Sequence, residues 1–198
     1  MNILLLGGFL GSGKTTVLSR LIETMIPQGN RLCVIENEIG QYAIDDLILK
    51  QSGVEVTTIM GGCVCCQVTG SLLEGLKRIK EEIDPDWVLV ELTGLALLDT
   101  LRETIETYLA DIGPVVTVAV MDGARWLKLR NAAYPIVSRQ VSGGDILVIN
   151  KIDRCPDVEA VVRDVSALVE NHPCLCMQAI SDAAGDLLKL INQQISSV

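Results

Sequence analysis

The residues with the clearest chemistry lie near the N-terminus, where Gly8 to Thr15 spell GFLGSGKT and match the pattern G-x-x-x-x-G-K-[ST]. Glycines allow backbone N–H groups to curl around a β-phosphate, and a lysine at this spacing bridges the β- and γ-phosphates. The threonine hydroxyl that follows is a ligand for Mg²⁺. A glycine turn that binds nothing would need neither residue. The expected nucleotide ligands of this loop are Gly8, Gly11, Ser12, Gly13, Lys14, Thr15 and Thr16.

A second motif, Asn150-Lys151-Ile152-Asp153, follows the apolar run Ile146 to Ile149. The Asp153 carboxylate can accept hydrogen bonds from N1–H and the 2-amino group of guanine, whereas adenine has neither donor there. Asn150 is expected on the N7 side of the base, the Lys151 stem over its face, and a backbone N–H near Ser181 on its O6. By itself NKID also fits a solvated loop, but beside the phosphate loop it favours GTP and GDP.

The strand-like run Trp87 to Val90 ends in Glu91-Leu92-Thr93-Gly94. A carboxylate at a strand end can hold a Mg-bound or attacking water, and a glycine N–H three residues later can meet a γ-phosphate. Lys14, Glu91 and Gly94 are therefore the candidate catalytic residues. The simpler alternative is an acidic residue that only ends a strand.

Acidic residues also follow the candidate strand Arg31 to Glu36. Asp45 lies in a segment expected to reach Mg²⁺ when GTP is bound, as a switch loop does. Glu38, or Glu36, is a candidate carboxylate for a second metal site described next.

That second site is expected at Cys63, Cys65 and Cys66, which lie in the glycine-flanked segment GGCVCC. Three thiols within four positions can converge on one thiophilic cation, and Zn²⁺, Co²⁺ and Ni²⁺ all fit. Three thiolates leave one tetrahedral position open, which Glu38 can fill and which suits a metal that is loaded and released. Free thiols in a loop are the alternative. Core packing is expected for the other cysteines considered, Cys33, Cys174 and Cys176, and a surface position for His172.

The elements that must position these residues alternate between apolar runs and stretches of helical period, which predicts an α/β fold with a mostly parallel sheet covered by helices on both faces. With the Gly8 to Thr15 motif directly after the first strand, the expected fold is that of a P-loop NTPase. The candidate strands are Asn2–Leu6, Arg31–Glu36, Glu55–Ile59, Trp87–Leu92, Val115–Met121, Asp145–Ile149 and Cys174–Ile180. Candidate helices follow Gly13, Ala43, Ser71, Leu95, Gly123, Pro135, Pro156 and Ala184. A capping box at Ser71 and Glu74 is expected to start the third helix.

Composition limits the remaining possibilities. The 198 residues carry 16 Lys and Arg against 25 Asp and Glu, for a net charge of −9. One domain spanning 1–198 is expected, and an acidic chain of this kind argues against nucleic acid and anionic membranes as partners. An odd cysteine count of seven and the absence of a long apolar run predict a reducing, cytoplasmic location.

The motifs GGFLGSGKTT, IENEIG, GGCVCC, ELTG and NKID occur in this order, and the chain resembles the CobW family of metal-chaperone GTPases, relatives of UreG and HypB. The C-x-C-C between E-N-E and E-x-T-G segments is specific to that family. The resemblance implies slow GTP hydrolysis, a nucleotide-linked homodimer, and delivery of Zn, Co or Ni to a client metalloprotein or a cofactor pathway such as that of cobalamin. It also favours metal ligation over free thiols at the C-x-C-C segment.

The chain departs from that family in two ways. Gln41 stands where family members usually have a glutamate, which removes one candidate ligand. Most members also carry a C-terminal domain, which is not expected within these 198 residues. Many have a His-rich stretch, which is not expected either, since the sequence holds one His.

Three functions compete on these grounds. The first is a GTPase that gates metal transfer. The second is a nucleotide-sensing adaptor whose metal is structural and which regulates a partner enzyme. The third, a small-molecule kinase, is disfavoured because a substrate lid would need basic residues and because NKID selects guanine.

Overall fold

The protein is built around a seven-stranded sheet in the order β3-β2-β4-β1-β5-β6-β7, with all neighbours parallel. This computed structural model describes residues 1–36, 55–58, 66–169 and 171–196. The strands are β1 Asn2–Gly7, β2 Leu32–Glu36, β3 Glu55–Thr58, β4 Trp87–Glu91, β5 Val115–Asp122, β6 Ile146–Asn150 and β7 Cys174–Met177. The α/β fold with a parallel sheet is therefore confirmed, and each described strand matches a predicted run.

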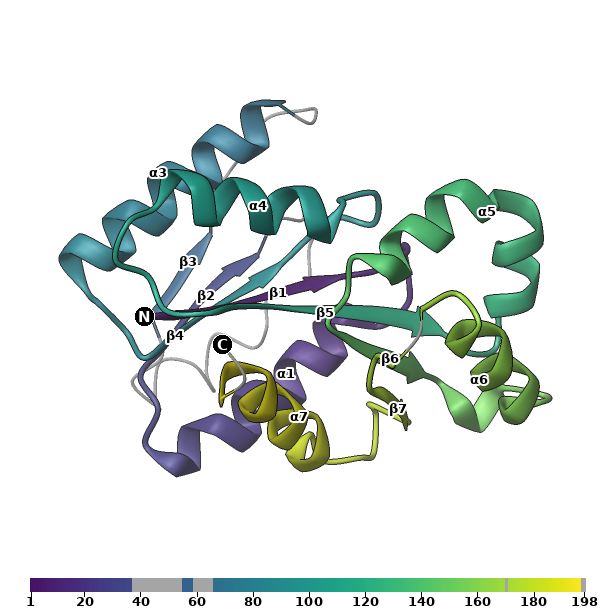
Figure 1. The fold of residues 1–198 in the computed structure, drawn as a ribbon. Coiled ribbons are helices and arrows are strands. Elements are labelled where there is room, and N and C mark those ends of the chain that lie inside the picture. Colours follow the sequence, from purple (N-terminus) through teal and green to yellow (C-terminus); the bar gives the residue numbers. More distant parts are fainter. Residues whose placement is uncertain (37–54, 59–65, 170, 197–198) are drawn as a thin grey trace.

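Helices cover both faces of the sheet (Figure 1). The described helices are α1 Lys14–Met25, α3 Cys66–Glu82, α4 Leu98–Tyr108, α5 Trp126–Ser142, α6 Val158–Ser166 and α7 Gly185–Ser196. Short 3-10 turns occupy Ile26–Gln28 and Ile152–Arg154. The helix expected after Ala43 lies outside the described residues. Along each strand, successive side chains point to opposite faces of the sheet. The central strands are apolar on both faces, and each face is covered by a different set of helices.

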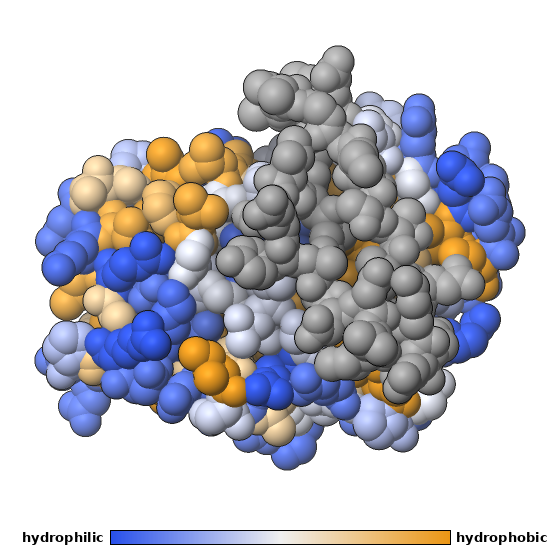
Figure 2. All heavy atoms as spheres, turned by 180° about the vertical axis from the view of Figure 1, so that it is seen from behind, coloured by the Kyte–Doolittle hydropathy of each residue, from blue (hydrophilic) through white to orange (hydrophobic). Residues whose placement is uncertain are grey.

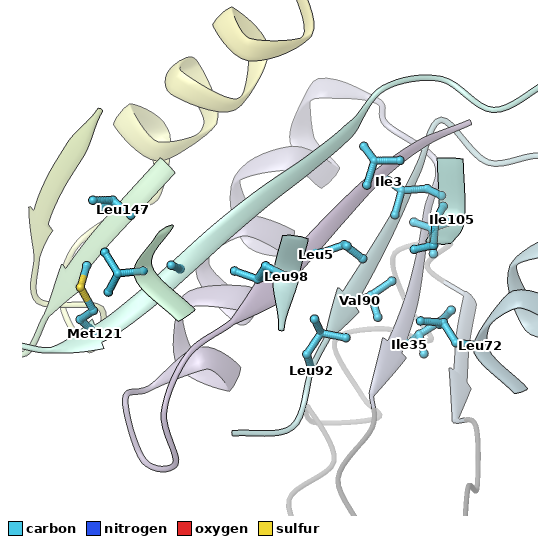
Figure 3. Close-up of a cluster of buried hydrophobic side chains, with 14 of the residues drawn as sticks. Ile3, Leu5, Ile35, Leu72, Val90, Leu92, Leu98, Ile105, Met121 and Leu147 are labelled. Carbon is cyan, nitrogen blue, oxygen red and sulfur yellow. The ribbon is translucent and has the colours of Figure 1, made fainter. Parts of the chain in front are cut away.

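The two cores follow that division. One packs α1 and α7 against residues such as Leu4, Val118 and Val148. The other packs α3, α4, α5 and α6 against the opposite face, and Figure 3 shows part of it, with Ile3, Leu5 and Val90 of the strands facing Leu72, Leu98 and Ile105 of the helices. The predicted apolar stripe of α3 is confirmed, since its Leu72, Leu76 and Ile79 are buried in this core. Cys33, Cys174 and Cys176 also pack into it, as predicted.

The predicted start of α3 is wrong. The helix begins at Cys66, so Ser71 and Glu74 lie inside it and do not form a capping box at its end. Residues three apart are neighbours on any helix surface, so the spacing alone does not distinguish a cap from an interior pair.

Two further boundaries differ from expectation. β7 ends at Met177, because the Asp182 carboxylate accepts from the Gln178 N–H at 2.6 Å and turns the chain out of the sheet. The two helices expected after Gly123 and Pro135 are both present within α5, and the non-helical Ala133 (φ −140°, ψ 36°) that separates them lies two residues before the proline. A proline lacks the N–H that continues the hydrogen-bond ladder of a helix, which explains the kink between the two helical segments.

Exposed apolar side chains concentrate on α5. Among the described residues, Leu127, Tyr134 and Ile136 of this helix are 44%, 48% and 45% exposed. Apolar surface gathers at the corresponding end of the molecule in Figure 2, which is turned by 180° from Figure 1. No helix in the described part of the chain is long and apolar enough to cross a membrane.

Candidate nucleotide site

The predicted site residues meet at one edge of the sheet. Because the strands are parallel, their carboxyl ends share this edge, and the loops after β1, β4, β5, β6 and β7 all leave from it. Ligands of open α/β sheets bind at this edge, where the strand order reverses. Here the reversal falls at β1, whose neighbours β4 and β5 come later in the chain.

The phosphate loop runs from Gly8 to Gly13 between β1 and α1. Gly8, Gly11 and Gly13 have φ values of 139°, 72° and 97°, which are accessible to glycine and strained for other residues. A side chain on Gly8 would also collide with the Val120 carbonyl of β5. The glycines of the motif therefore have a conformational role in addition to the phosphate contact that the sequence predicts.

Lys14 and Ser12 are buried polar residues of this loop. The Lys14 side chain donates to the Gly8 carbonyl at 3.2 Å, which folds it over the loop. Ser12 is 0% exposed, and its hydroxyl has no hydrogen-bond partner among the described residues. Burying the Ser12 hydroxyl without a partner is costly unless a ligand compensates for it.

The predicted Mg²⁺ ligands Thr15 and Glu91 come into direct contact. The Thr15 hydroxyl donates to Glu91 Oε1 at 2.8 Å, although 76 positions separate the residues. Glu91 is only 4% exposed, at the end of β4 beside β1. A hydroxyl and a carboxylate oxygen are the hard donors that Mg²⁺ prefers, so this pair fits the ion.

Gly94 lies against the phosphate loop. A side chain on Gly94 would meet the Leu10 backbone nitrogen at 2.8 Å, so only glycine allows this approach. Its carbonyl accepts from the buried Gln140 side chain of α5 at 2.6 Å. Gln140, which the sequence analysis did not select, thus binds the carbonyl of the predicted γ-phosphate sensor.

Asn150 joins three segments at the end of β6. Its Nδ2 donates to the Ser12 carbonyl at 3.0 Å, and its Oδ1 accepts from the backbone N–H groups of Ala179 at 3.0 Å and Lys151 at 2.8 Å. Asn150 therefore fixes the phosphate loop relative to both base-binding loops, which is a larger role than the N7 contact expected of it.

Asp122 is the buried carboxylate that the sequence analysis missed. It ends β5 directly beside Asn150, is 4% exposed, and accepts from Lys151 Nζ at 2.9 Å and Arg125 Nε at 2.8 Å. Burial favours a higher pKa for Asp122, but hydrogen bonds from Lys151 and Arg125 outweigh it, so the pKa lies below its ordinary value. The sequence pattern could have predicted Asp122, because this carboxylate follows an apolar run as Glu91 does.

The residues predicted to recognise the base lie on two neighbouring loops. Asp153 is in the turn Ile152–Arg154, with a side chain 28% exposed that contacts Arg154 Nε at 3.4 Å. In the loop after β7, the amides of Ala179, Ser181 and Asp182 all donate to acceptors of the protein. Within the described part of the chain, the intervening Ile180 amide makes no hydrogen bond.

The metal-site candidates cannot be placed in the same way. Glu38, Asp45, Cys63 and Cys65 lie outside the described residues, as does Gln41. Cys66 is the first residue of α3. Among the residues that the structure does describe, no three His, Cys, Asp or Glu side chains form a cluster suited to a metal ion.

Comparison with known proteins decides the family. The profile of the CobW/HypB/UreG nucleotide-binding domain matches residues 2–191. The chain belongs to this family. The resemblance based on the five motifs is therefore confirmed, and family members are GTPases and metallochaperones.

Named relatives agree with that assignment. The chain is 35% identical to the Escherichia coli zinc chaperone YeiR over 76% of its own length and 46% of that protein, and 26% identical to the zinc chaperone CobW of a Sinorhizobium species over 91% and 60%. It spans about half the length of such curated relatives. Among solved structures, hydrogenase maturation factor HypB of Archaeoglobus fulgidus superimposes with a TM-score of 0.73 at 17% identity, covering 98% of this chain and 90% of that one. Zn(II)-bound YjiA of Escherichia coli superimposes with a TM-score of 0.60 at 24% identity, covering 90% and 57%.

Proposed function

We propose that this protein is a GTP-hydrolysing metallochaperone. It would bind Zn²⁺, Co²⁺ or Ni²⁺ as cargo at Cys63, Cys65 and Cys66 and deliver it to a client metalloprotein or a cofactor-pathway enzyme in a reducing cytoplasm. The observation that carries the proposal is the Thr15–Glu91 hydrogen bond of 2.8 Å, because it joins the phosphate loop to the segment expected to respond to the γ-phosphate. Names of relatives that include zinc chaperones support the choice of cargo.

Each side chain has a distinct task in this proposal. Lys14 would neutralise the β- and γ-phosphates, and Thr15, Glu91 and Asp45 would hold Mg²⁺, which supplies charge neutralisation at the transferred phosphoryl group. Glu91 would orient the attacking water, and the Gly94 N–H would bind the γ-phosphate.

Guanine would be selected by the two loops beyond β6 and β7. Asp153 would exchange its contact with Arg154 for the N1–H and 2-amino donors of the base. The Ile180 N–H, which is not used within the described protein, is a better donor to guanine O6 than Ser181, whose N–H already donates to the Gln178 carbonyl at 2.9 Å.

The link to the cargo follows from topology. β3 is parallel to β2, so the chain leaves β3 at Thr58 on the nucleotide-binding edge and enters α3 at Cys66. In the sequence the cysteine segment lies between these points, and in the sheet β2 alone separates β3 from β4, the strand that ends in Glu91. We propose that GTP and GDP states differ in how this segment holds metal, and that the active form is a homodimer linked by nucleotide.

The decisive test is a Zn²⁺, Co²⁺ and Ni²⁺ titration of the reduced protein with a non-hydrolysable GTP analogue and with GDP. We expect metal affinity to differ at least about tenfold between the two states, which corresponds to a typical coupling between sites. Lys14→Ala should abolish that difference together with GTP hydrolysis. Equal affinity in both states would contradict gated transfer, and an unchanged metal site without any GTP hydrolysis would favour the adaptor hypothesis.

A further inference from the structure

Three consecutive carbonyls of the phosphate loop are each held by a side chain from the other half of the sheet. The Leu10 carbonyl accepts from Arg125 Nη2 at 3.0 Å, the Gly11 carbonyl from Lys151 Nζ at 2.6 Å, and the Ser12 carbonyl from Asn150 Nδ2 at 3.0 Å. Asn150 and Lys151 belong to the NKID motif. Arg125, which directly precedes α5, belongs to none of the motifs of the sequence.

These contacts matter because of how a peptide unit is built. In a trans peptide, the C=O of one residue and the N–H of the next point in opposite directions. A donor that holds the Leu10 carbonyl therefore aims the Gly11 N–H to the other side, and one that holds the Ser12 carbonyl does the same for Gly13. Within the described residues, the Gly11 and Gly13 amides donate to no protein acceptor.

The glycines themselves support this arrangement. A side chain on Gly11 would lie 2.9 Å from Arg125 Nη2, and one on Gly13 would collide with Asn150 Nδ2. The space next to each glycine is thus filled by the donor that holds the preceding carbonyl. Arg125 next to Gly11 and Asn150 next to Gly13 therefore have the same relation to the loop, at positions two residues apart.

Asp122 fixes the direction of Arg125. Its Oδ2 accepts from Arg125 Nε at 2.8 Å and from Lys151 Nζ at 2.9 Å, and its Oδ1 accepts from the Arg125 backbone N–H at 3.1 Å. The Asp122 side chain is 3% exposed, against 48% for Arg125. A buried carboxylate that holds both a backbone and a side-chain nitrogen of one arginine limits the directions in which its guanidinium can point.

We infer that Arg125, anchored by Asp122, is a positioning residue of the phosphate loop: it orients the Leu10–Gly11 peptide so that the Gly11 N–H binds the β-phosphate of a nucleoside diphosphate or triphosphate. The inference rests on the proposed nucleotide binding. It adds a residue that acts through the loop and touches neither base nor metal.

The test compares Arg125→Met with Arg130→Met. Arg130 is a matched control, because it is in α5, pairs with Asp164 through Nε at 2.7 Å, and, within the described part of the chain, makes no hydrogen bond to the phosphate loop. Affinities for GDP and for GMP, which lacks the β-phosphate, are measured by calorimetry or by competition with a fluorescent GDP. Arg125→Met should weaken GDP binding about tenfold, as expected for loss of a charge-assisted contact, and change GMP binding less than about twofold. Arg130→Met should change neither.

Two further variants separate positioning from general damage. Arg125→Lys should recover most of the GDP affinity, since it keeps the charge and a donor. Asp122→Asn should cost less in the Arg125→Met background than in the wild type, because part of its effect passes through Arg125. Unchanged GDP affinity in Arg125→Met, or an equal loss for GMP, overturns the inference. Failure of the wild-type protein to bind GDP would instead refute the proposed function.

Discussion

Aspartate–arginine contacts occur at both the amino and the carboxyl edge of the sheet, but the polar groups around them differ. At the amino edge, Asp145 accepts from Arg102 at 2.6 Å and from the N–H and hydroxyl of Thr117 at 2.8 and 2.9 Å, and the Asp145 N–H donates back to Thr117 at 2.9 Å. Every partner in this network belongs to the protein. At the carboxyl edge, Asp122 also binds an arginine, but the Ser12 hydroxyl and the Ile180, Gly11 and Gly13 amides beside it have no protein partner in the described structure.

The difference shows how a buried polar group can be assigned to structure or to function. A network that satisfies itself contributes to stability, whereas a buried group without a protein partner, such as the Ser12 hydroxyl, together with unused amides at the same edge favours a ligand there. Changes at the carboxyl edge should therefore alter ligand binding more than folding, and changes at the amino edge should do the reverse.

The largest effect is expected from Asp153→Asn at the carboxyl edge. An amide at this position cannot accept from both guanine donors, but it can donate to the 2-oxo group of xanthine. We expect GTP affinity to fall about a hundredfold and affinity for xanthosine triphosphate to rise, since the base then leaves no buried group unpaired. Equilibrium binding of both nucleotides measures this exchange. Arg154→Met is the control and should leave the preference for guanine intact; a parallel loss of both nucleotides would mean that Asp153 supports the fold instead.

A smaller effect, on stability alone, is expected from Asp145→Asn at the amino edge. This change removes the charge that Arg102 binds and turns one acceptor of the Thr117 network into a donor. The free energy of unfolding should fall by about 2 kcal/mol, within the range for a partly buried hydrogen-bonded ion pair. Urea unfolding gives this value, and GDP affinity should not change once the protein is folded.

Asp99→Asn provides the comparison for that measurement. Asp99 and Arg139 are 3.9 Å apart with side chains 40% and 58% exposed, so their pairing should contribute less than about 0.5 kcal/mol. Equal losses in the Asp99 and Asp145 variants would remove the distinction between a closed network and a surface ion pair.

A separate effect on stability concerns alkaline pH. Burial, with a lesser contribution from the Cys176 thiol, raises the pKa of Cys174 from 9.0 to about 11. A thiol whose pKa is raised in the folded state favours folding fully below pH 9, and this advantage is lost as pH rises from about 9 to 11. The contribution is about 1–2 kcal/mol. Unfolding measured at pH 8 and pH 10.5 should show a smaller loss in Cys174→Val than in the wild type.

The stability contribution of Asp122, at the carboxyl edge, depends on pH with the opposite sign. Because the pKa of Asp122 is lowered, its stabilising effect is present above its unfolded pKa and is lost as pH falls through the folded value. Acid should therefore disturb the nucleotide edge first, and alkali the region of β7.

The sequence was sufficient to predict the strands and to place polar residues at their carboxyl ends, because apolar runs ending in a polar residue mark the carboxyl edge of a parallel sheet. Glu91 and Asn150 were found in this way. Arg125 and Gln140 were not, since each acts by a side-chain contact with a distant backbone carbonyl, at Leu10 and Gly94. Such contacts depend on how α5 packs on β5, and neither residue pattern nor spacing encodes that.

Helix boundaries were less predictable for a related reason. The Ser71 and Glu74 spacing is as common within a helix as at its start, and Pro135 marks a kink as readily as an end. Local patterns leave both alternatives open, and tertiary packing selects between them.

The strand order also determines when during synthesis the protein can first bind its ligand. β1 is made first, yet its neighbours in the sheet are Trp87–Glu91 and Val115–Asp122, and the Ser12 carbonyl is held by Asn150. The phosphate loop thus lacks the Asn150 contact until the chain has been made through β6. Until β4 has been made, the apolar β1 strand is unpaired and exposed to aggregation, so nascent chains of this protein should depend on general folding chaperones before nucleotide can stabilise them.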